Sequence, residues 1–178
     1  MSDETRRLDT AGEYDPVVLG QIYDEYFGRI YSYIYHRLGD SRVAEDLTAD
    51  VFLRMVESVK AEKAWQSSLT GWLYRIAHNL VIDYYRRQSK RDGPSLDERL
   101  VAAVESPSLR MDTLLVQDQL RAAIQTLTEE QQQVVVLKFV EDLNNAEVAE
   151  VLGKTEGAVK ALQHRALIAL RRVLGDTV

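Results

Sequence analysis

Positively charged side chains recur at helical spacing between residues 144 and 174, a pattern typical of a helix that enters a DNA groove. They are Lys154, Lys160, Arg165, Arg171 and Arg172, and from Lys154 onward the single acid is Glu156. Ammonium and guanidinium groups neutralise phosphates and donate hydrogen bonds to base edges. The chemistry that this segment predicts is therefore DNA recognition.

The residues around these cations predict a helix-turn-helix. Asn145 is expected to cap a short helix running from about residue 146 to 152, and Gly153 to end it in the left-handed conformation. Thr155 is expected to cap the longer second helix, and the branched Val159 to fill the corner between the two. The alternative is an ordinary amphipathic helical hairpin.

A second basic cluster lies earlier in the chain and is mixed with aromatic rings. Its cations are Arg75, Arg86, Arg87, Lys90 and Arg91, facing only Asp83. The rings are Trp65, Trp72, Tyr74, Tyr84 and Tyr85. Rings beside cations suit stacking on unpaired bases, although Trp72 and Tyr84 also fit a hydrophobic core. Asn79 lies four residues after Arg75 and so shares its helical face.

The overall charge limits where nucleic acid can bind. The net charge of the 178 residues is −6, and residues 1–62 hold thirteen acids against seven bases. An acidic chain with two basic faces is expected to bring only those faces to DNA. No run approaches the ~20 apolar residues of a membrane span, and the N-terminus lacks a signal core. We therefore expect a cytoplasmic protein without direct membrane insertion.

Catalysis is not predicted. The histidines His36, His78 and His164 are scattered over three expected helices, and no acid lies near them at metal-ligand spacing. The chain has no cysteine and no glycine-rich phosphate loop. We expect no cofactor, no metal and no small-molecule substrate.

Apolar periodicity and capping residues predict an all-α protein. The first expected helix covers residues 16–38 and is ended by Gly39. The second is capped by Ser41 and runs to about Val59, and the third covers residues 69–91. A fourth is capped by Ser108 and runs to about residue 125, and a fifth begins with the capping box 128–131 and carries the apolar residues of 134–139. For the third helix the predicted inner face is Trp72, Leu73, Ile76, Ala77, Leu80 and Tyr84.

Composition divides the chain into two small helical domains. The segments 92–95 and 106–108 hold glycine, proline and serine, and all nine tyrosines lie before residue 86. We expect an N-terminal tail at 1–13, a first domain at 14–92, a flexible linker at 93–112 and a second domain at 113–178.

Three stretches resemble a known family. Residues 42–54 (RVAEDLTADVFLR) resemble the polymerase-binding helix of bacterial sigma factors. Residues 72–79 (WLYRIAHN) with 83–87 (DYYRR) resemble the helix that recognises the promoter −10 element, and 127–174 resemble the −35 reader. Their order is similar to that in the extracytoplasmic-function (group IV) members of the sigma-70 family, which keep only sigma domain two and sigma domain four.

The resemblance implies a sigma factor, not an enzyme. It would bind bacterial core RNA polymerase and direct promoter-specific transcription initiation by recognising −35 DNA and by melting and recognising −10 DNA. It also implies control by an anti-sigma factor, which can hold the protein near the membrane.

The resemblance further assigns residues to three surfaces. Core-polymerase binding falls to Asp46, Leu47, Asp50, Val51 and Arg54. The −10 DNA would meet Trp65, Gln66, Ser67, Ser68, Tyr74, Arg75, Asn79, Arg86 and Arg87. The −35 DNA would meet Lys138, Thr155, Glu156, Lys160, Ala161, His164 and Arg165.

One alternative function stays open. A stand-alone helix-turn-helix regulator would use its N-terminal helices to sense an effector or to dimerise. It explains residues 144–174 but not a second basic and aromatic helix. Binding to RNA polymerase separates the two hypotheses, since a repressor binds its operator alone.

Overall fold

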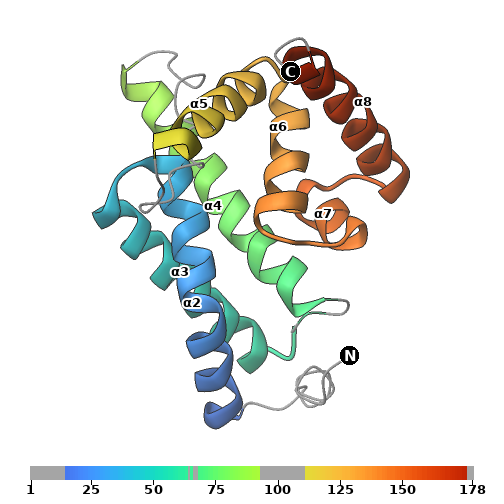
Figure 1. Ribbon diagram of the computed structural model, residues 1–178. Helices are drawn as coiled ribbons and strands as arrows, with labels where there is room; N and C mark the ends of the chain where they lie inside the picture. Colours follow the sequence, from blue (N-terminus) through green and yellow to red (C-terminus); the bar gives the residue numbers. More distant parts are fainter. Residues whose placement is uncertain (1–14, 64, 66–67, 93–110, 176–178) are drawn as a thin grey trace.

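The computed structural model describes residues 15–63, 65, 68–92 and 111–175, and every regular element in these ranges is a helix (Figure 1). The elements are α2 (Pro16–Leu38), α3 (Ser41–Lys60), α4 (Leu69–Asp92), α5 (Met111–Gln125), α6 (Glu129–Val135), the π-helix η2 (Val136–Val140), α7 (Asn145–Leu152) and α8 (Glu156–Gly175). The predicted all-α fold is confirmed. The predicted tail at 1–13, the cap Ser108 and most of the predicted linker lie outside the described residues.

The first helix has the ends that its sequence predicts. The carboxylate of Asp15 accepts a hydrogen bond from the Val17 amide at 2.9 Å, and Pro16 occupies the first helical position. Gly39 ends α2 with φ 69°, in the left-handed region that glycine adopts without strain.

Two predicted caps are wrong by one residue. Asp40, not Ser41, caps α3, because its extended backbone lets the carboxylate accept from the amides of Arg42 and Val43. Asn144, not Asn145, caps α7 and accepts from the Glu147 amide at 2.9 Å. In both places two capping residue types are adjacent, and the earlier one has the extended backbone that a cap requires.

Helices α2, α3 and α4 enclose the core of the N-terminal half. On α4 the buried residues are Leu69, Leu73, Tyr74, Ala77, His78, Leu80, Val81 and Tyr85. Trp72, Ile76 and Tyr84, predicted to face inward, are only half-buried. The prediction assumed one packed side, whereas α4 packs against α2 and α3 on one side and against α7 on another.

The C-terminal half begins as predicted and then departs from a regular helix. Thr128 and Gln131 form the expected capping box, with both reciprocal hydrogen bonds present. The helix then widens into η2, where the predicted continuous α-helix is wrong. Phe139 and Val140 are consequently about half exposed, although the sequence placed Phe139 among the apolar residues of this helix.

The two halves pack against each other. Figure 1 shows α4 between the pair α2–α3 and the pair α6–α7, and buried residues from both halves form one continuous hydrophobic cluster. A smaller cluster joins α5, α6 and α8 through residues such as Ile124, Val135 and Leu170. This arrangement brings the two predicted DNA-binding elements, α4 and the α7–α8 pair, together.

Candidate nucleic-acid interfaces

Helices α7 and α8 form the predicted helix-turn-helix. Gly153 has φ 62°, and the Lys154 amide then donates to the Ala149 carbonyl at 2.9 Å, which completes the turn. The Thr155 hydroxyl accepts from the Ala158 amide at 3.1 Å and so caps α8 as predicted. Val159 is fully buried between the helices.

Helix α8 separates an anchoring side from an exposed basic side. Val159, Leu162, Ala166 and Leu170 are buried and hold the helix to its neighbours. Among the residues predicted to meet −35 DNA, Thr155, Glu156, Lys160, His164 and Arg165 are exposed, Ala161 is half-buried, and Lys138 is half-buried on η2. Lys154 lies in the turn and is held by Glu130 of α6, with Nζ 2.6 Å from the carboxylate.

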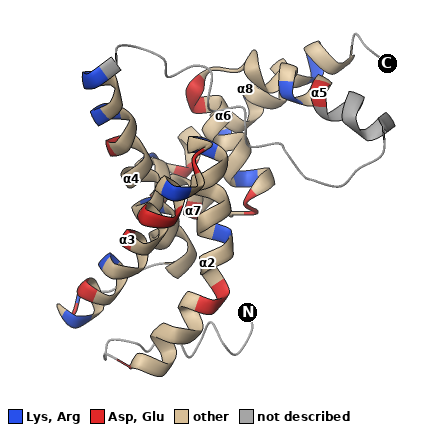
Figure 2. Ribbon diagram, turned by 90° about the vertical axis from the view of Figure 1, so that its left-hand side faces the viewer, with Lys and Arg blue, Asp and Glu red and all other residues tan. Residues whose placement is uncertain are grey.

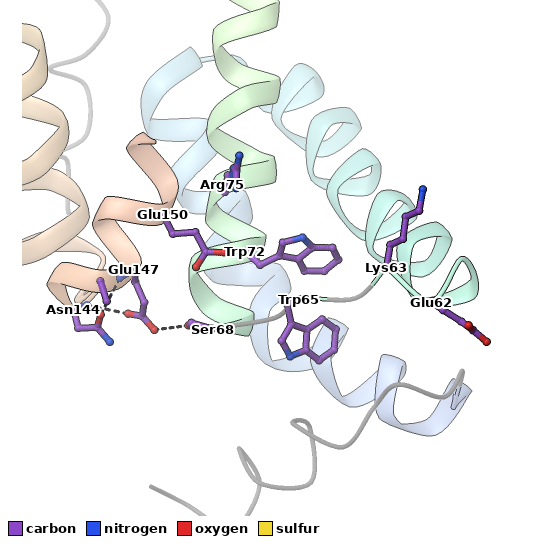
Figure 3. Close-up of a pocket in the computed structure, with 10 residues that line it drawn as sticks. Glu62, Lys63, Trp65, Ser68, Trp72, Arg75, Asn144, Glu147 and Glu150 are labelled. Carbon is purple, nitrogen blue, oxygen red and sulfur yellow. Dashed lines mark hydrogen bonds between the residues drawn. The ribbon is translucent and has the colours of Figure 1, made fainter. Parts of the chain in front are cut away.

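The loop before α4 and helix α7 enclose a cleft of about 740 Å³ (Figure 3). The indoles of Trp65 and Trp72 lie side by side in it, with ring centroids 5.5 Å apart and planes inclined by 44°. Ser68 and Arg75 also line the cleft. The structure therefore brings together four of the residues predicted to bind −10 DNA or to flank that site.

The opposite wall of the cleft is acidic and comes from the helix-turn-helix. Glu147 and Glu150 of α7 line it (Figure 3). The Glu147 carboxylate accepts from the Ser68 hydroxyl at 2.7 Å and, through its other oxygen, from the Asn144 amide at 2.9 Å. One side chain thus completes the cap of α7 and binds the start of α4.

Tyr74 is not at a DNA-facing surface, which corrects its predicted −10 role. Its ring is fully buried, and its hydroxyl donates to the Glu141 carboxylate at 2.7 Å. Burial, and then the neighbouring carboxylate, raise the pKa of Tyr74, so the hydroxyl remains a proton donor. Desolvation raises the pKa of Glu141, whereas Tyr74, Arg29 and His36 act to lower it.

The remaining predicted −10 residues lie along α4. Arg75, Asn79, Arg86 and Arg87 are exposed, and Arg86 forms an ion pair with Asp83 at 2.9 Å. Figure 2 shows the basic residues that end α4 at the tip of a projecting helix. Gln66 and Ser67 lie outside the described residues.

The predicted polymerase-binding residues share one outer side of α3 with one exception. Asp46, Asp50 and Arg54 are exposed and Leu47 is half-buried. Val51 is fully buried in the core, so its assignment to a docking face is wrong in this structure. On a helix that packs against two others, Val51 falls on the inner stripe with Ala44 and Met55.

The histidines have no shared chemistry. Nδ1 of His78 lies 2.9 Å from Nη1 of Arg37 and 3.2 Å from the Tyr33 hydroxyl, inside the contact of α2 with α4. Burial, and then the Arg37 charge, lower the pKa of His78 to about 4, which keeps the ring neutral. Among the described residues no His, Asp and Glu cluster can hold a metal ion.

Among the described residues, no helix combines the length and the apolar character that crossing a bilayer requires.

Comparison with known proteins assigns each half of the chain to a conserved region of the sigma-70 family. The family model described as Sigma-70 region 2 matches residues 22–91, and the one described as Sigma-70, region 4 matches residues 117–170. The ECF RNA polymerase sigma factor BldN of Streptomyces coelicolor is 37% identical over 98% of this chain and 68% of its own length. The chain belongs to the extracytoplasmic-function sigma factors. It is therefore a promoter-specificity factor for RNA polymerase.

Other relatives of this sigma factor agree in sequence and fold. The ECF RNA polymerase sigma factor SigW of Bacillus subtilis is 29% identical over 96% of both chains. The solved structure of CnrH with the cytosolic domain of CnrY has a TM-score of 0.65 at 20% identity, over 99% of this chain and 100% of that one. RpoE with the anti-sigma factor NepR from Bartonella quintana has a TM-score of 0.66 at 19% identity, over 88% and 96%. These structures support the fold.

Sequence reasoning did not find three residues that shape the sigma factor's α4–α7 contact. Glu141 and Glu147 meet residues 67 and 79 positions away, and Arg29 donates to the Glu141 carbonyl oxygen at 3.4 Å. Glu147 had one detectable signal, since it stands three residues after its cap Asn144. Nothing local marks Glu141 or Arg29.

Proposed function

We propose that this sigma factor contacts the transcription machinery through three separate surfaces. The exposed side of α3, with Asp46, Asp50 and Arg54, docks on core RNA polymerase. The surface around Trp65, Arg75 and the end of α4 holds the −10 strand, and the exposed side of α8 reads the −35 element. No small-molecule substrate or catalytic step is needed for this work.

The observation that carries the proposal is the division of α8 into two sides. Its apolar side is buried against α6 and α7, which leaves Lys160, His164 and Arg165 on the solvent side of the N-terminal half of the helix. Recognition helices contact base edges with residues of their N-terminal turns, so this end is the one that enters the major groove. Half-buried indole rings and exposed cations around α4 suit an unpaired strand.

A run-off transcription assay tests the function. Bacterial core RNA polymerase is incubated with a pool of genomic promoters, with and without the protein. Promoter-specific transcripts that depend on the protein are expected, and they would give the −35 and −10 sequences together. Absence of transcripts, with no detectable association with core polymerase, would favour a stand-alone helix-turn-helix regulator.

The proposed docking surface on α3 is tested by measuring how the variant Asp50→Arg associates with core RNA polymerase. This reversal of charge on α3 is expected to abolish association with core polymerase while circular dichroism remains native, because Asp50 is exposed. A matched reversal, Asp24→Arg on the exposed side of α2, should leave association intact. Unchanged binding of Asp50→Arg would remove α3 from the docking face.

The −35 assignment is tested by Arg165→Ala against Arg172→Ala, two exposed arginines on one helix. Loss of a base contact costs ~1–3 kcal/mol. Arg165→Ala should therefore reduce −35-dependent transcription about tenfold or more, and Arg172→Ala less, because Arg165 lies nearer the helix start. Equal losses would contradict this register of α8 in the groove.

We also propose that an anti-sigma factor controls this protein in the cytoplasm. The two structural neighbours were solved with the cytosolic domain of CnrY and with the anti-sigma factor NepR. Apolar side chains on α8 stay exposed and offer a contact surface; they are Leu167, Ile168 and Val173. Ile168→Asp should weaken a partner that represses the run-off reaction, and full repression of this variant would place the partner elsewhere.

A further inference from the structure

Arg37, in the last turn of α2, carries a buried positive charge. The residue lies against α4 and is only 5% exposed. Among the residues that the structure describes, no carboxylate forms an ion pair with it, and its Nε has no hydrogen-bond partner. A buried charge is costly unless it is paired. The packing of the core therefore does not explain why this position holds an arginine.

Neutral groups surround the guanidinium of Arg37. Its Nη1 donates to the Tyr33 hydroxyl at 2.9 Å and lies 2.9 Å from Nδ1 of His78. The guanidinium carbon lies 5.6 Å from the centroid of the Tyr33 ring, whose face attracts a cation. Because the pKa of His78 is lowered by burial and then by the Arg37 charge, the imidazole stays neutral and Nδ1 can accept the hydrogen bond.

Arg37 holds α4 at two places that are two helical turns apart. Its guanidinium bonds to His78, and its main-chain carbonyl oxygen accepts a hydrogen bond from the Tyr85 hydroxyl. That carbonyl belongs to the last turn of α2, where carbonyl groups lack partners within the helix. Residues seven apart lie on one face of a helix, so a single residue of α2 determines how this face of α4 is turned. Apolar contacts are non-directional and fix such a rotation less well.

The exposed side of α4 is set by the same two contacts. Asn79 and Arg86 follow His78 and Tyr85 directly in the sequence, and both are exposed. Successive helical residues are turned by about 100°, so any rotation of α4 on α2 moves Asn79 and Arg86 together. Beyond Tyr85 no described residue of α4 is buried, and the helix projects with its basic end (Figure 2).

We propose that Arg37 is a positioning residue for promoter recognition, which fixes α4 on α2 so that Asn79 and Arg86 meet the −10 strand in one register. Arg37 does not touch DNA and acts through His78 and Tyr85. The proposal rests on the assignment of the −10 surface to α4. A buried polar group in this role contributes a unique arrangement of two helices more than it contributes stability.

The variant Arg37→Met removes the buried charge without leaving polar groups unpaired. Methionine is also long and unbranched, and the Tyr33 hydroxyl, 3.2 Å from Nδ1 of His78, can donate to that nitrogen instead. Replacing a buried charge by an apolar side chain is often neutral for stability. We therefore expect Arg37→Met to fold with native helix content.

Spin labels on the full-length protein measure whether α4 is fixed. Because the chain has no cysteine, two introduced ones, Glu25→Cys on α2 and Lys90→Cys near the end of α4, carry the labels at exposed positions. Wild type should give one narrow distribution of distances between the labels, and Arg37→Met a broader or shifted one. The matched control is Arg121→Met on α5, which should leave the distribution unchanged.

Run-off transcription with core RNA polymerase measures the consequence for recognition. Wild type should prefer the mapped promoter over one with a single changed −10 base by about tenfold or more, and Arg37→Met by about threefold or less. A single changed −35 base should cost both proteins the same, because α8 is not held by Arg37. This internal control separates a loss of register at α4 from a general loss of activity.

A second variant keeps the test decisive if Arg37→Met folds poorly. Tyr85→Phe retains the buried ring and removes the hydroxyl that donates to the Arg37 carbonyl oxygen. It should broaden the distance distribution and lower the preference at −10 in the same direction, by less than Arg37→Met. Tyr35→Phe, at an exposed ring of α2, should change neither.

The outcomes separate the positioning role from the proposed function. A broadened distribution together with a reduced preference at −10 alone supports it. An unchanged distribution in the folded variants, or an unchanged preference at −10, overturns it even when transcription is normal. Equal losses at −10 and −35 that follow a lower free energy of unfolding would assign Arg37 to stability and overturn it as well. If wild type itself shows no preference at −10, the proposed function fails, while the spin labels still decide whether Arg37 fixes α4.

Discussion

The two packed sides of α4 differ in the chemistry that holds them. Toward α2 and α3 the helix presents fully buried Leu73, Ala77 and Val81, together with the neutral His78 that meets Arg37. Toward α7 it presents Gly71 and two hydrogen bonds to carboxylates. Both sides belong to one continuous apolar cluster, and the second side differs by adding these hydrogen bonds between the two halves.

This difference affects how much each polar group contributes to stability. Apolar burial contributes ~25 cal/mol per Å² removed from water and holds both sides of α4. A net hydrogen bond contributes only ~1 kcal/mol, because water replaces it when the contact is lost. The hydrogen bonds of the α7 side are therefore a small addition to an apolar contact.

The largest expected effect is on the α2 side. Leu73→Ala removes a fully buried side chain and should lower the free energy of unfolding by ~2–5 kcal/mol, because a cavity remains in the core. Urea denaturation followed by circular dichroism measures it. Gly71→Leu in the same assay should lower the free energy of unfolding less, because a displaced Glu150 carboxylate can relieve most of the crowding; similar losses of stability in both variants would contradict the distinction.

The second largest expected effect is that acid destabilises the contact of α4 with α2. The folded pKa of His78, about 4, lies below its ordinary value of 6.5, so the folded state prefers the neutral ring. Its contribution is complete above pH 6.5 and is lost as pH falls toward 4, by ~3 kcal/mol in total. Stability measured across this window in wild type and in His78→Asn, whose oxygen still accepts from Arg37, gives the difference.

The exposed His164→Asn is the control for that titration and should retain the acid sensitivity. If His78→Asn loses stability between pH 6.5 and 4 as steeply as wild type, another group is responsible.

Local rules predicted most of the fold. Pro16 and Gly39 bound α2, Thr128 opens α6, and Gly153 makes the turn before α8, because capping and glycine conformations depend on neighbouring residues. Adjacent capping residues shifted two helix starts by one position. The π-helix η2 was not predicted, since apolar periodicity does not distinguish it from an α-helix.

The site was predicted in residue type more than in geometry. The exposed cations of α8 lie where an amphipathic helix places them, and Trp65 lies with Trp72 at the cleft. Tyr74 and Val51 were assigned to surfaces but are buried, because α4 and α3 each pack on more sides than one apolar stripe reveals. The contacts across α4 and α7 join residues too distant in sequence for any local rule.

The effect expected from a change on the α7 side is smaller than the two effects expected on the α2 side. Tyr74→Phe keeps the buried ring and removes the hydroxyl that donates to Glu141. Loss of this hydrogen bond should lower the free energy of unfolding by ~1 kcal/mol, with native helix content. Urea denaturation followed by circular dichroism measures the loss. Tyr23→Phe, at an exposed ring of α2, should have no effect; an equal loss there would show that the assay responds to something other than the Tyr74–Glu141 hydrogen bond.

The smallest expected effect comes from Glu141, whose contribution to stability should depend on pH in the opposite direction to that of His78. Burial raises the pKa of Glu141 in the folded protein above its ordinary value of 4.5, although Tyr74, Arg29 and His36 favour its charge. Its contribution to stability is therefore complete below pH 4.5 and is lost as pH rises through the raised pKa, because the carboxylate then ionises inside the contact.

Glu141→Gln should remove this dependence, since its amide oxygen still accepts from Tyr74 and carries no charge. The free energy of unfolding of wild type, measured relative to that of Glu141→Gln, should fall by a small amount as the pH rises above 4.5. The carboxylate of Asp142, exposed beside Glu141, gives the control Asp142→Asn, which should behave as wild type. Acid weakens the contribution of His78 and strengthens that of Glu141, so the two contributions to stability should change in opposite directions over one titration. A parallel change would mean that the two titrating groups of α4's contacts respond to acid in the same way.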